Sequence, residues 1–403
     1  MLYRKFPALK YRDFRLWWIG QLLSNVGTQM QTVAINWHIY ILTHSALALG
    51  AIGLMRVLPI VLVSMIAGSV ADTYNSKIVN LIIQIILAVL SFILFLMTFL
   101  HTINPAAIYI ITVLSMIAAS FEMTTRQALI PNLIEKEHFT NAMSLNVLMR
   151  ETSNIAGPAI AGILIAATGV APIYLLNALS FIAVIIALIL MHASGKAEGQ
   201  TSGISIAAMK EGIIFIKSRS IIWSTMLLDC FGTFFAGAMT LLPIFAKDIL
   251  SVGPQGLGLL YASPSIGAVI AGYFVAQKAQ IRKQGKIILA AVAVYALGTI
   301  IFGFSKSFIL SCLALFLIGA GDSVSTIIRN TIRQLNTPDN MRGRMVAINM
   351  VFFMGGPQLG EFEAGLLAAY IGAPLSVVIG GIGALLVVTV IGIAIPKLRN
   401  YDK

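Results

Sequence analysis

The sequence predicts an all-α membrane protein whose twelve transmembrane helices form two pseudo-symmetric six-helix bundles. Three observations support this fold class. Of the 403 residues, 58% are hydrophobic and 10% are charged, and the mean hydropathy is +0.92, whereas about a quarter of a soluble protein is charged. Most of the chain lies in apolar segments of about 20 residues or more, enough to cross a bilayer. Finally, motifs recur after about two hundred residues. Composition alone excludes most soluble enzymes.

The apolar segments divide six and six around the longest polar stretch, residues 192–219. We therefore expect an N-terminal bundle at 1–191, a cytoplasmic linker with an amphipathic helix at 192–219, and a C-terminal bundle at 220–403. The first segment is too long and too polar for a removable signal peptide, so we expect it to remain as the first span. The twelve predicted spans are 15–41, 46–71, 78–100, 106–130, 140–168, 170–191, 220–246, 257–276, 287–304, 308–333, 344–370 and 373–395.

The net charge of +12 has a topological explanation. If the N-terminus is cytoplasmic, 23 of the 27 Lys and Arg residues lie at the cytoplasmic ends of the spans, and only Lys247 and Lys306 lie on the other side. This distribution obeys the positive-inside rule, so both termini are expected in the cytoplasm. The basic residues then face the lipid bilayer, and no nucleic-acid partner is expected.

The two halves share motifs at nearly constant offsets. Gly157-Pro158 corresponds to Gly356-Pro357, and Ala171-Pro172 corresponds to Ala373-Pro374. Duplicated bundles around a site at mid-membrane depth are the plan of alternating-access transporters. The alternative is chance, because Gly and Pro are common in membrane helices.

Polar side chains follow one face of the first predicted helix and of its counterpart in the second half. Such stripes predict a water-accessible substrate cavity; the alternative is that the side chains only bond neighbouring helices. Ser24, Gln31 and His38, on the other side of the first helix, are expected to make such interhelical contacts. The cavity residues would be Gln21, Asn25, Gln29, Thr32 and Asn36 in the first half, and Thr225, Thr233, Thr240 and Asn349 in the second.

Ionisable residues within predicted spans are candidates for coupling transport to protons, because burying a charge in a membrane is costly. Asp229 and Asp322 are the leading candidates, since neither has an arginine at similar depth; Arg329 and Arg333 lie one to two turns nearer the cytoplasm. Arg56 is expected to pair with Glu122 or Glu151, the available acids of its own half, which leaves the other of these two acids to titrate. The further coupling candidates are Glu363, Glu122 and Glu151, and Arg150 is expected to be a structural charge.

Several motifs are absent. The sequence has no P-loop, so we expect no ATP site, and no catalytic constellation or cofactor motif. Cys230 and Cys312 have no neighbouring Cys or His pattern, so neither a metal site nor a disulfide is expected.

The chain resembles the major facilitator superfamily, and several motifs carry the resemblance. Residues 68–77, with Asp72 and Lys77, resemble its signature after the second helix, which latches cytoplasmic helix ends together. Gly157-Pro158 lies in a segment similar to its antiporter signature. Ordered motifs in both halves resemble the drug:proton antiporter branch that contains the enterobactin exporter and macrolide efflux proteins: Arg126-Gln127-Ala128, Asn141-Ala142, Gln334, Pro338-Asp339, Arg342-Gly343-Arg344 and Gly356-Pro357.

This resemblance implies a proton-coupled exporter in the bacterial inner membrane, a monomer that moves a medium-sized organic molecule such as a siderophore or a macrolide-like drug. Two alternatives remain: a facilitator or importer of a small metabolite, and a non-transporting membrane sensor or scaffold.

Overall fold

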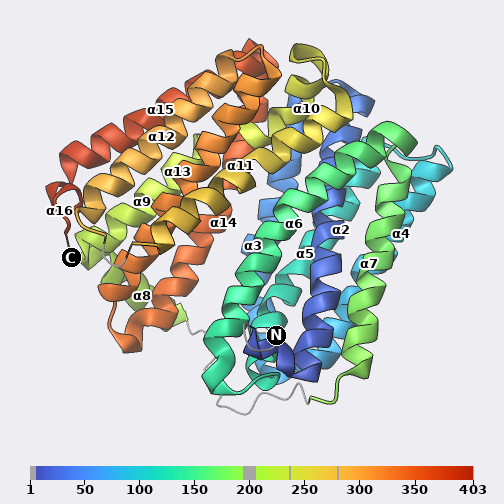
Figure 1. Cartoon of the computed structure of the whole chain (residues 1–403), viewed down its shortest axis with the longest axis horizontal. Coiled ribbons are helices and arrows are strands. Elements are labelled where there is room, and N and C mark those ends of the chain that lie inside the picture. The colour runs from blue at the N-terminus through green and yellow to red at the C-terminus, as the bar shows by residue number, and fades with distance from the viewer. Residues whose placement is uncertain (1–5, 194–205, 236, 279–280, 403) are drawn as a thin grey trace. The chain divides into compact units, whose positions relative to one another are not determined.

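The computed structural model describes residues 6–193, 206–235, 237–278 and 281–402. These residues form helices and turns and no β-strand (Figure 1), which confirms the all-helical prediction. The chain divides into two compact units. Unit 1 comprises residues 1–42 and 58–204, and unit 2 comprises residues 43–57 and 205–403.

Six long helices belong wholly or in part to unit 1, and among them α4 packs against both α5 and α7. The first part of α3, up to residue 57, is grouped with unit 2. The helices are α2 (Arg12–Thr43), α3 (Ala46–Thr73), α4 (Ser76–Phe99), α5 (Pro105–Leu129), α6 (Phe139–Thr168) and α7 (Ala171–Leu190).

Unit 2 begins with the linker helix, and its later helices pack in the pairs α11 with α13, α12 with α13 and α15, and α9 with α14. Its helices are α8 (Ile206–Ser218), α9 (Ser220–Phe234), α10 (Leu242–Ile244), α11 (Gly253–Ala276), α12 (Gln284–Phe304), α13 (Phe308–Leu335), α14 (Asp339–Ile371), α15 (Ala373–Ala394) and α16 (Pro396–Arg399).

In the described part of the chain, eight helical segments are long and apolar enough to cross a membrane. Each of the twelve predicted ranges is largely helical, but the number of spans stays a prediction. Residues 220–246 are not one continuous α-helix: α9 ends at Phe234 and is followed by a 3₁₀ turn, α10 and a π turn (Phe245–Ile249). Gly237 and Gly360 bring this segment into backbone contact with α14, because a Cβ on either would overlap the other segment's main chain.

Helix α4 has the polarity expected of a membrane helix. Its polar side chains Asn80, Gln84 and Ser91 are buried inside unit 1. Large apolar side chains cover the opposite face, including Ile82, Ile85, Ile86, Val89, Phe92 and Ile93. A soluble helix buries its apolar face, so this reversed pattern is what a helix facing lipid requires.

Helix ends follow the local sequence. The Asn75 side chain accepts hydrogen bonds from the backbone N–H groups of Lys77 and Ile78 and caps α4, and Asn104 caps α5 in the same manner. Gly169 and Gly372 end α6 and α14 with φ of 81° and 86°, a backbone conformation that favours glycine. Gly169 lies two residues before Ala171-Pro172, and Gly372 lies directly before Ala373-Pro374. The duplication itself stays a prediction.

Candidate functional site

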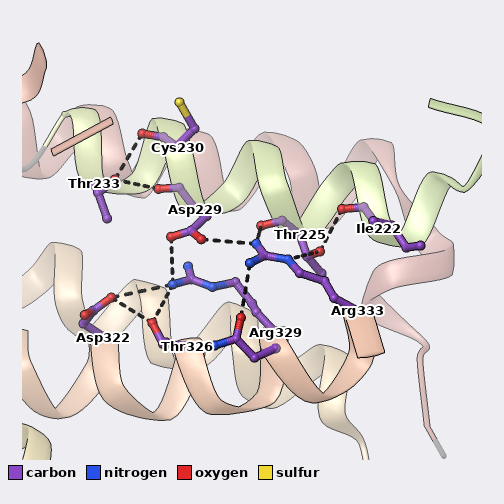
Figure 2. A network of polar contacts seen from close by, with 10 residues as sticks. Ile222, Thr225, Asp229, Cys230, Thr233, Asp322, Thr326, Arg329 and Arg333 are labelled. Atoms are coloured by element: carbon purple, nitrogen blue, oxygen red, sulfur yellow. Dashed lines mark hydrogen bonds and ion pairs between the residues drawn. The ribbon is translucent and has the colours of Figure 1, made fainter. Parts of the chain in front are cut away.

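A buried network of charges joins α9 to α13 within unit 2 (Figure 2). Asp229 on α9 accepts from two arginines of α13: Arg329 Nη2 lies 2.9 Å from Oδ1, and Arg333 Nη2 lies 3.2 Å from Oδ2. All three side chains are at most 3% exposed. Arg329 and Arg333 are four residues apart and therefore share one face of α13.

Each nitrogen of the Arg333 guanidinium has a hydrogen-bond acceptor. Its Nε donates to Thr225 Oγ1 at 3.1 Å and its Nη2 to the Thr225 carbonyl at 2.8 Å. Its Nη1 donates to Asn330 Oδ1 at 3.4 Å. Thr225, predicted to line a cavity, is fully buried and accepts two of these hydrogen bonds from Arg333.

Arg329 also contacts a second acid, Asp322, through the same nitrogen that contacts Asp229 (Figure 2). Its Nη2 lies 3.6 Å from Asp322 Oδ1, and the Asp322 side chain is 48% exposed. Thr326 Oγ1 accepts from Arg329 Nη2 at 2.9 Å and lies 3.4 Å from Asp322 Oδ1. Two carboxylates therefore balance two guanidinium groups.

The expectation that Asp229 and Asp322 lack an arginine partner is wrong. Sequence position gives the depth of each Cα atom in its helix, but not the depth that the end of a long side chain reaches. Helical side chains tilt toward the N-terminus of their helix, so the long side chains of Arg329 and Arg333 extend back along α13 to the level of Asp229.

A small cavity of ≈ 10 Å³ adjoins this network, about the volume that one water occupies. Two buried polar atoms of its lining residues, Arg329 Nε and Ser325 Oγ, have no hydrogen-bond partner among the described residues. The lining residues are Leu228, Gly232, Thr233, Val292, Tyr295, Asp322, Ser325 and Arg329.

The polar stripe of α2 lies in unit 1 and is partly exposed. Asn25 donates to the Gln21 carbonyl at 2.6 Å, and Gln29 donates to Asn154 Oδ1 of α6 at 2.6 Å. Asn25, Gln29 and Thr32 are half-buried, whereas Gln21 and Asn36 are buried. Only the middle of the stripe is therefore available to a molecule that enters this unit.

The other face of α2 makes the interhelical contacts predicted for Gln31 and His38. Asn177 of α7 donates to Gln31 Oε1 at 2.8 Å. His38 Nδ1 lies 3.1 Å from the Tyr174 hydroxyl. These side chains connect α2 to α7 inside unit 1.

The predicted partner of Arg56 is wrong. Arg56 Nη1 lies 3.6 Å from Glu361 Oε2 of α14, because residues 43–57 pack with unit 2 rather than with the remainder of the first half. Glu122 accepts a long hydrogen bond from Gln21 at 3.4 Å. Glu151 pairs with its neighbour Arg150 at 3.2 Å.

Glu363 differs from the other acids within predicted spans. Its side chain is half-buried, and among the described residues it makes no ion pair or side-chain hydrogen bond. Asn349, predicted on the same face of α14, has a buried Oδ1 without a partner there. Thr240 is buried and donates to the Leu49 carbonyl at 3.1 Å.

The residues of the motifs that resemble the major facilitator superfamily make close contacts. A Cβ at Gly157 would meet α2, and one at Gly356 would meet α9, while Pro158 and Pro357 lie inside their helices. Arg126 stacks over Trp17 with its Cζ 5.3 Å from the ring centroid. Lys77 Nζ donates to the Met191 carbonyl at 2.6 Å. The side chain of its predicted latch partner, Asp72, lies outside the described residues.

From the sequence, Glu361 is one more ionisable residue within a predicted span, without an assigned role, and Asn154 and Ser325 were missed as members of these sites. Asn154 lies one turn after Arg150 on a helix that also carries Glu151, so a search for polar side chains on the fifth predicted span would have found it. Ser325 carries no such signal. Over residues 6–193, 206–235, 237–278 and 281–402 no three His, Cys, Asp or Glu side chains come together as a metal site.

Comparison with known proteins identifies the family. Residues 4–403 match the family model described as transmembrane secretion effector. The enterobactin exporter EntS of Salmonella typhimurium is 25% identical over 389 residues, which cover 96% of this chain and 93% of that protein. The same exporter from Escherichia coli O9:H4 is 24% identical over 388 residues, again 96% and 93% of the two chains.

Solved structures share the fold. A bacterial homologue of the iron transporter ferroportin, in an inward-facing state, has a TM-score of 0.72 at 16% identity and covers 97% of this chain and 99% of its own. The nucleoside transporter NupG has a TM-score of 0.68 at 14% identity, covering 97% and 100%. These relatives are membrane transporters, not enzymes. The chain therefore belongs to the transmembrane secretion effector family of the major facilitator superfamily, as a multi-pass protein of the bacterial inner membrane.

Proposed function

We propose that this protein is a proton-coupled secondary exporter that moves a medium-sized organic molecule, such as a siderophore or a macrolide-like drug, by alternating access. The observation that carries this proposal is the similarity to enterobactin exporters over 96% of the chain. That similarity supports both outward direction and a siderophore-like substrate.

The proposed arrangement has twelve spans in two six-helix bundles, with both termini in the cytoplasm and one chain as the working unit. The charge distribution of the sequence supports the orientation. In this arrangement the half-buried side chains Asn25, Gln29 and Thr32 of α2 and Thr233 of α9 contribute to the substrate path.

The contacts favour Asp322 and Glu363 over Asp229 as the groups that gain and lose a proton. Protonating Asp229 would leave Arg329 and Arg333 buried with a single partly exposed counter-charge, and an uncompensated buried charge is strongly unfavourable. Asp322 is half exposed, and Glu363 has no ion-pair partner among the described residues. Asp229 then acts as the fixed counter-ion of α13.

Proteoliposomes that contain a pH-sensitive dye test the proposal. Addition of enterobactin to wild-type vesicles is expected to change the internal pH, and Asp322→Asn or Glu363→Gln is expected to reduce that change while substrate binding is retained. Glu211→Gln is the matched control, because Glu211 is an exposed acid of the linker helix that pairs with Arg344. A wild-type protein that moves enterobactin with no pH change would refute proton coupling.

A second test concerns the substrate. A deletion strain of the source bacterium, grown with limiting and with replete iron, is expected to retain the exported molecule inside the cell under one of the two conditions. Unchanged secreted and retained metabolites in both conditions would refute export of a siderophore.

A further inference from the structure

Arg329 has two acidic partners that are held very differently. Asp229 Oδ1 lies 2.9 Å from Arg329 Nη2 and its side chain is 3% exposed. Asp322 Oδ1 lies 3.6 Å from the same nitrogen and its side chain is 48% exposed. Water can therefore hydrate Asp322 as it leaves the guanidinium, and Asp229 is then the one carboxylate of this network beside Arg329 and Arg333.

The surroundings of Arg329 offer unused hydrogen-bonding capacity. Arg329 Nε is buried and lacks an acceptor among the described residues, and Ser325 Oγ is likewise without a partner. Both residues line the ≈ 10 Å³ cavity, together with Thr233 and Tyr295. Buried N–H groups are almost always paired, so an oxygen atom placed beside Arg329 Nε satisfies a donor that the protein itself leaves open.

The position of Asp322 on its helix also points to the interior of the protein. Asp322 lies near the middle of α13, which spans Phe308–Leu335 and is long and apolar enough to cross a membrane. Charged side chains at such depth face the bundle interior or a water-filled space rather than lipid. The exposed half of Asp322 is therefore on a route that a transported molecule can take.

We propose that Arg329 is a subsite for an anionic oxygen group of the transported molecule, a carboxylate or a similar planar oxyanion, and that Asp322 occupies this guanidinium when the molecule is absent. The inference rests on the proposed transport function and deepens it by naming a substrate class. A guanidinium presents its N–H groups as a planar fork that matches a carboxylate. Asp322 is the natural competitor because it is itself a carboxylate.

Equilibrium binding to purified protein in lipid nanodiscs tests this proposal without requiring transport. The probes are radiolabelled benzoate and its neutral isostere benzamide. Asp322→Asn removes the competing charge and nearly preserves the side-chain shape, so it is expected to bind benzoate about tenfold more tightly than the wild type, or about 1.4 kcal/mol. Benzamide binding is expected to stay the same.

Two further variants check the geometry. Asp322→Glu places a carboxylate on a longer side chain and is expected to weaken benzoate binding. Arg329→Lys in the Asp322→Asn background keeps a positive charge but loses the planar fork, so it is expected to remove most of the gain. Glu211→Gln, which removes an exposed acid paired with Arg344 on the linker helix, is expected to change neither probe.

The proposal is overturned if Asp322→Asn binds benzoate no more tightly than the wild type, or if it tightens benzoate and benzamide equally. Export measured in parallel separates this outcome from failure of the proposed function. Export with unchanged benzoate binding refutes the anion subsite alone, whereas tighter benzoate binding without any export refutes the transport function alone.

Discussion

Replacing Asp229 by Asn should destabilise the protein far more than the same change at Asp322. Asp229 is 3% exposed and pairs with two buried guanidinium groups at 2.9 and 3.2 Å. Removing one partner of a buried ion pair costs about 3–5 kcal/mol, because the remaining charge is left without compensation. The Asp322–Arg329 pair is 3.6 Å long and its carboxylate is 48% exposed, and exposed ion pairs contribute about 0–1 kcal/mol.

The assay is the free energy of unfolding of each variant, measured by denaturant titration in mixed micelles. Glu211→Gln is an informative control, because its ion pair with Arg344 is the shorter one at 2.7 Å but is well exposed. A small loss in this control would show that burial, rather than distance, determines the cost.

A double variant tests the origin of the loss. Adding Arg333→Gln to Asp229→Asn removes one positive charge as well, so the network is neutral again and part of the stability is expected to return. Coupling of this kind between contacting residues is typically about 0.5–3 kcal/mol. The reasoning is refuted if Asp229→Asn loses no more stability than Asp322→Asn, or if the double variant only adds the two losses.

Three other predictions follow from the packing and the polar contacts. Gly319→Ala should destabilise unit 2 by about 1–3 kcal/mol, because its Cβ would overlap the backbone of α11, whereas Gly343→Ala, whose Cβ meets no atom within 4 Å, should be neutral or stabilising in the same denaturant titration. Arg56→Gln should lower thermal stability by leaving Glu361, which is 18% exposed, without its counter-charge, and a Glu361→Gln change in the same chain should restore part of that stability; no recovery would exclude the ion pair as the cause. Gln29→Ala should alter the relative export of different substrates, since its amide is half-buried in the polar stripe; an unchanged substrate profile would exclude this face from the substrate path.

The amino-acid sequence predicts the protein class and the approximate position of most helices. Apolar segment length locates the helices, because a bilayer sets a minimum length for any element that crosses it. The face of α2 that binds neighbouring helices was predicted as well, since helical spacing fixes which side chains share a face.

Which charges meet depends on how the helices pack. The sequence places Arg56, Asp229 and Arg329 on their helices but contains no direct signal for which helices are neighbours. Arg56 pairs with Glu361, more than three hundred positions away, because the first turns of α3 pack with unit 2. Asp229 meets Arg329 and Arg333 because arginine side chains extend more than a turn along the helix from their Cα atoms. Depth along a helix follows from sequence, whereas the partner of a buried charge depends on packing and on side-chain reach.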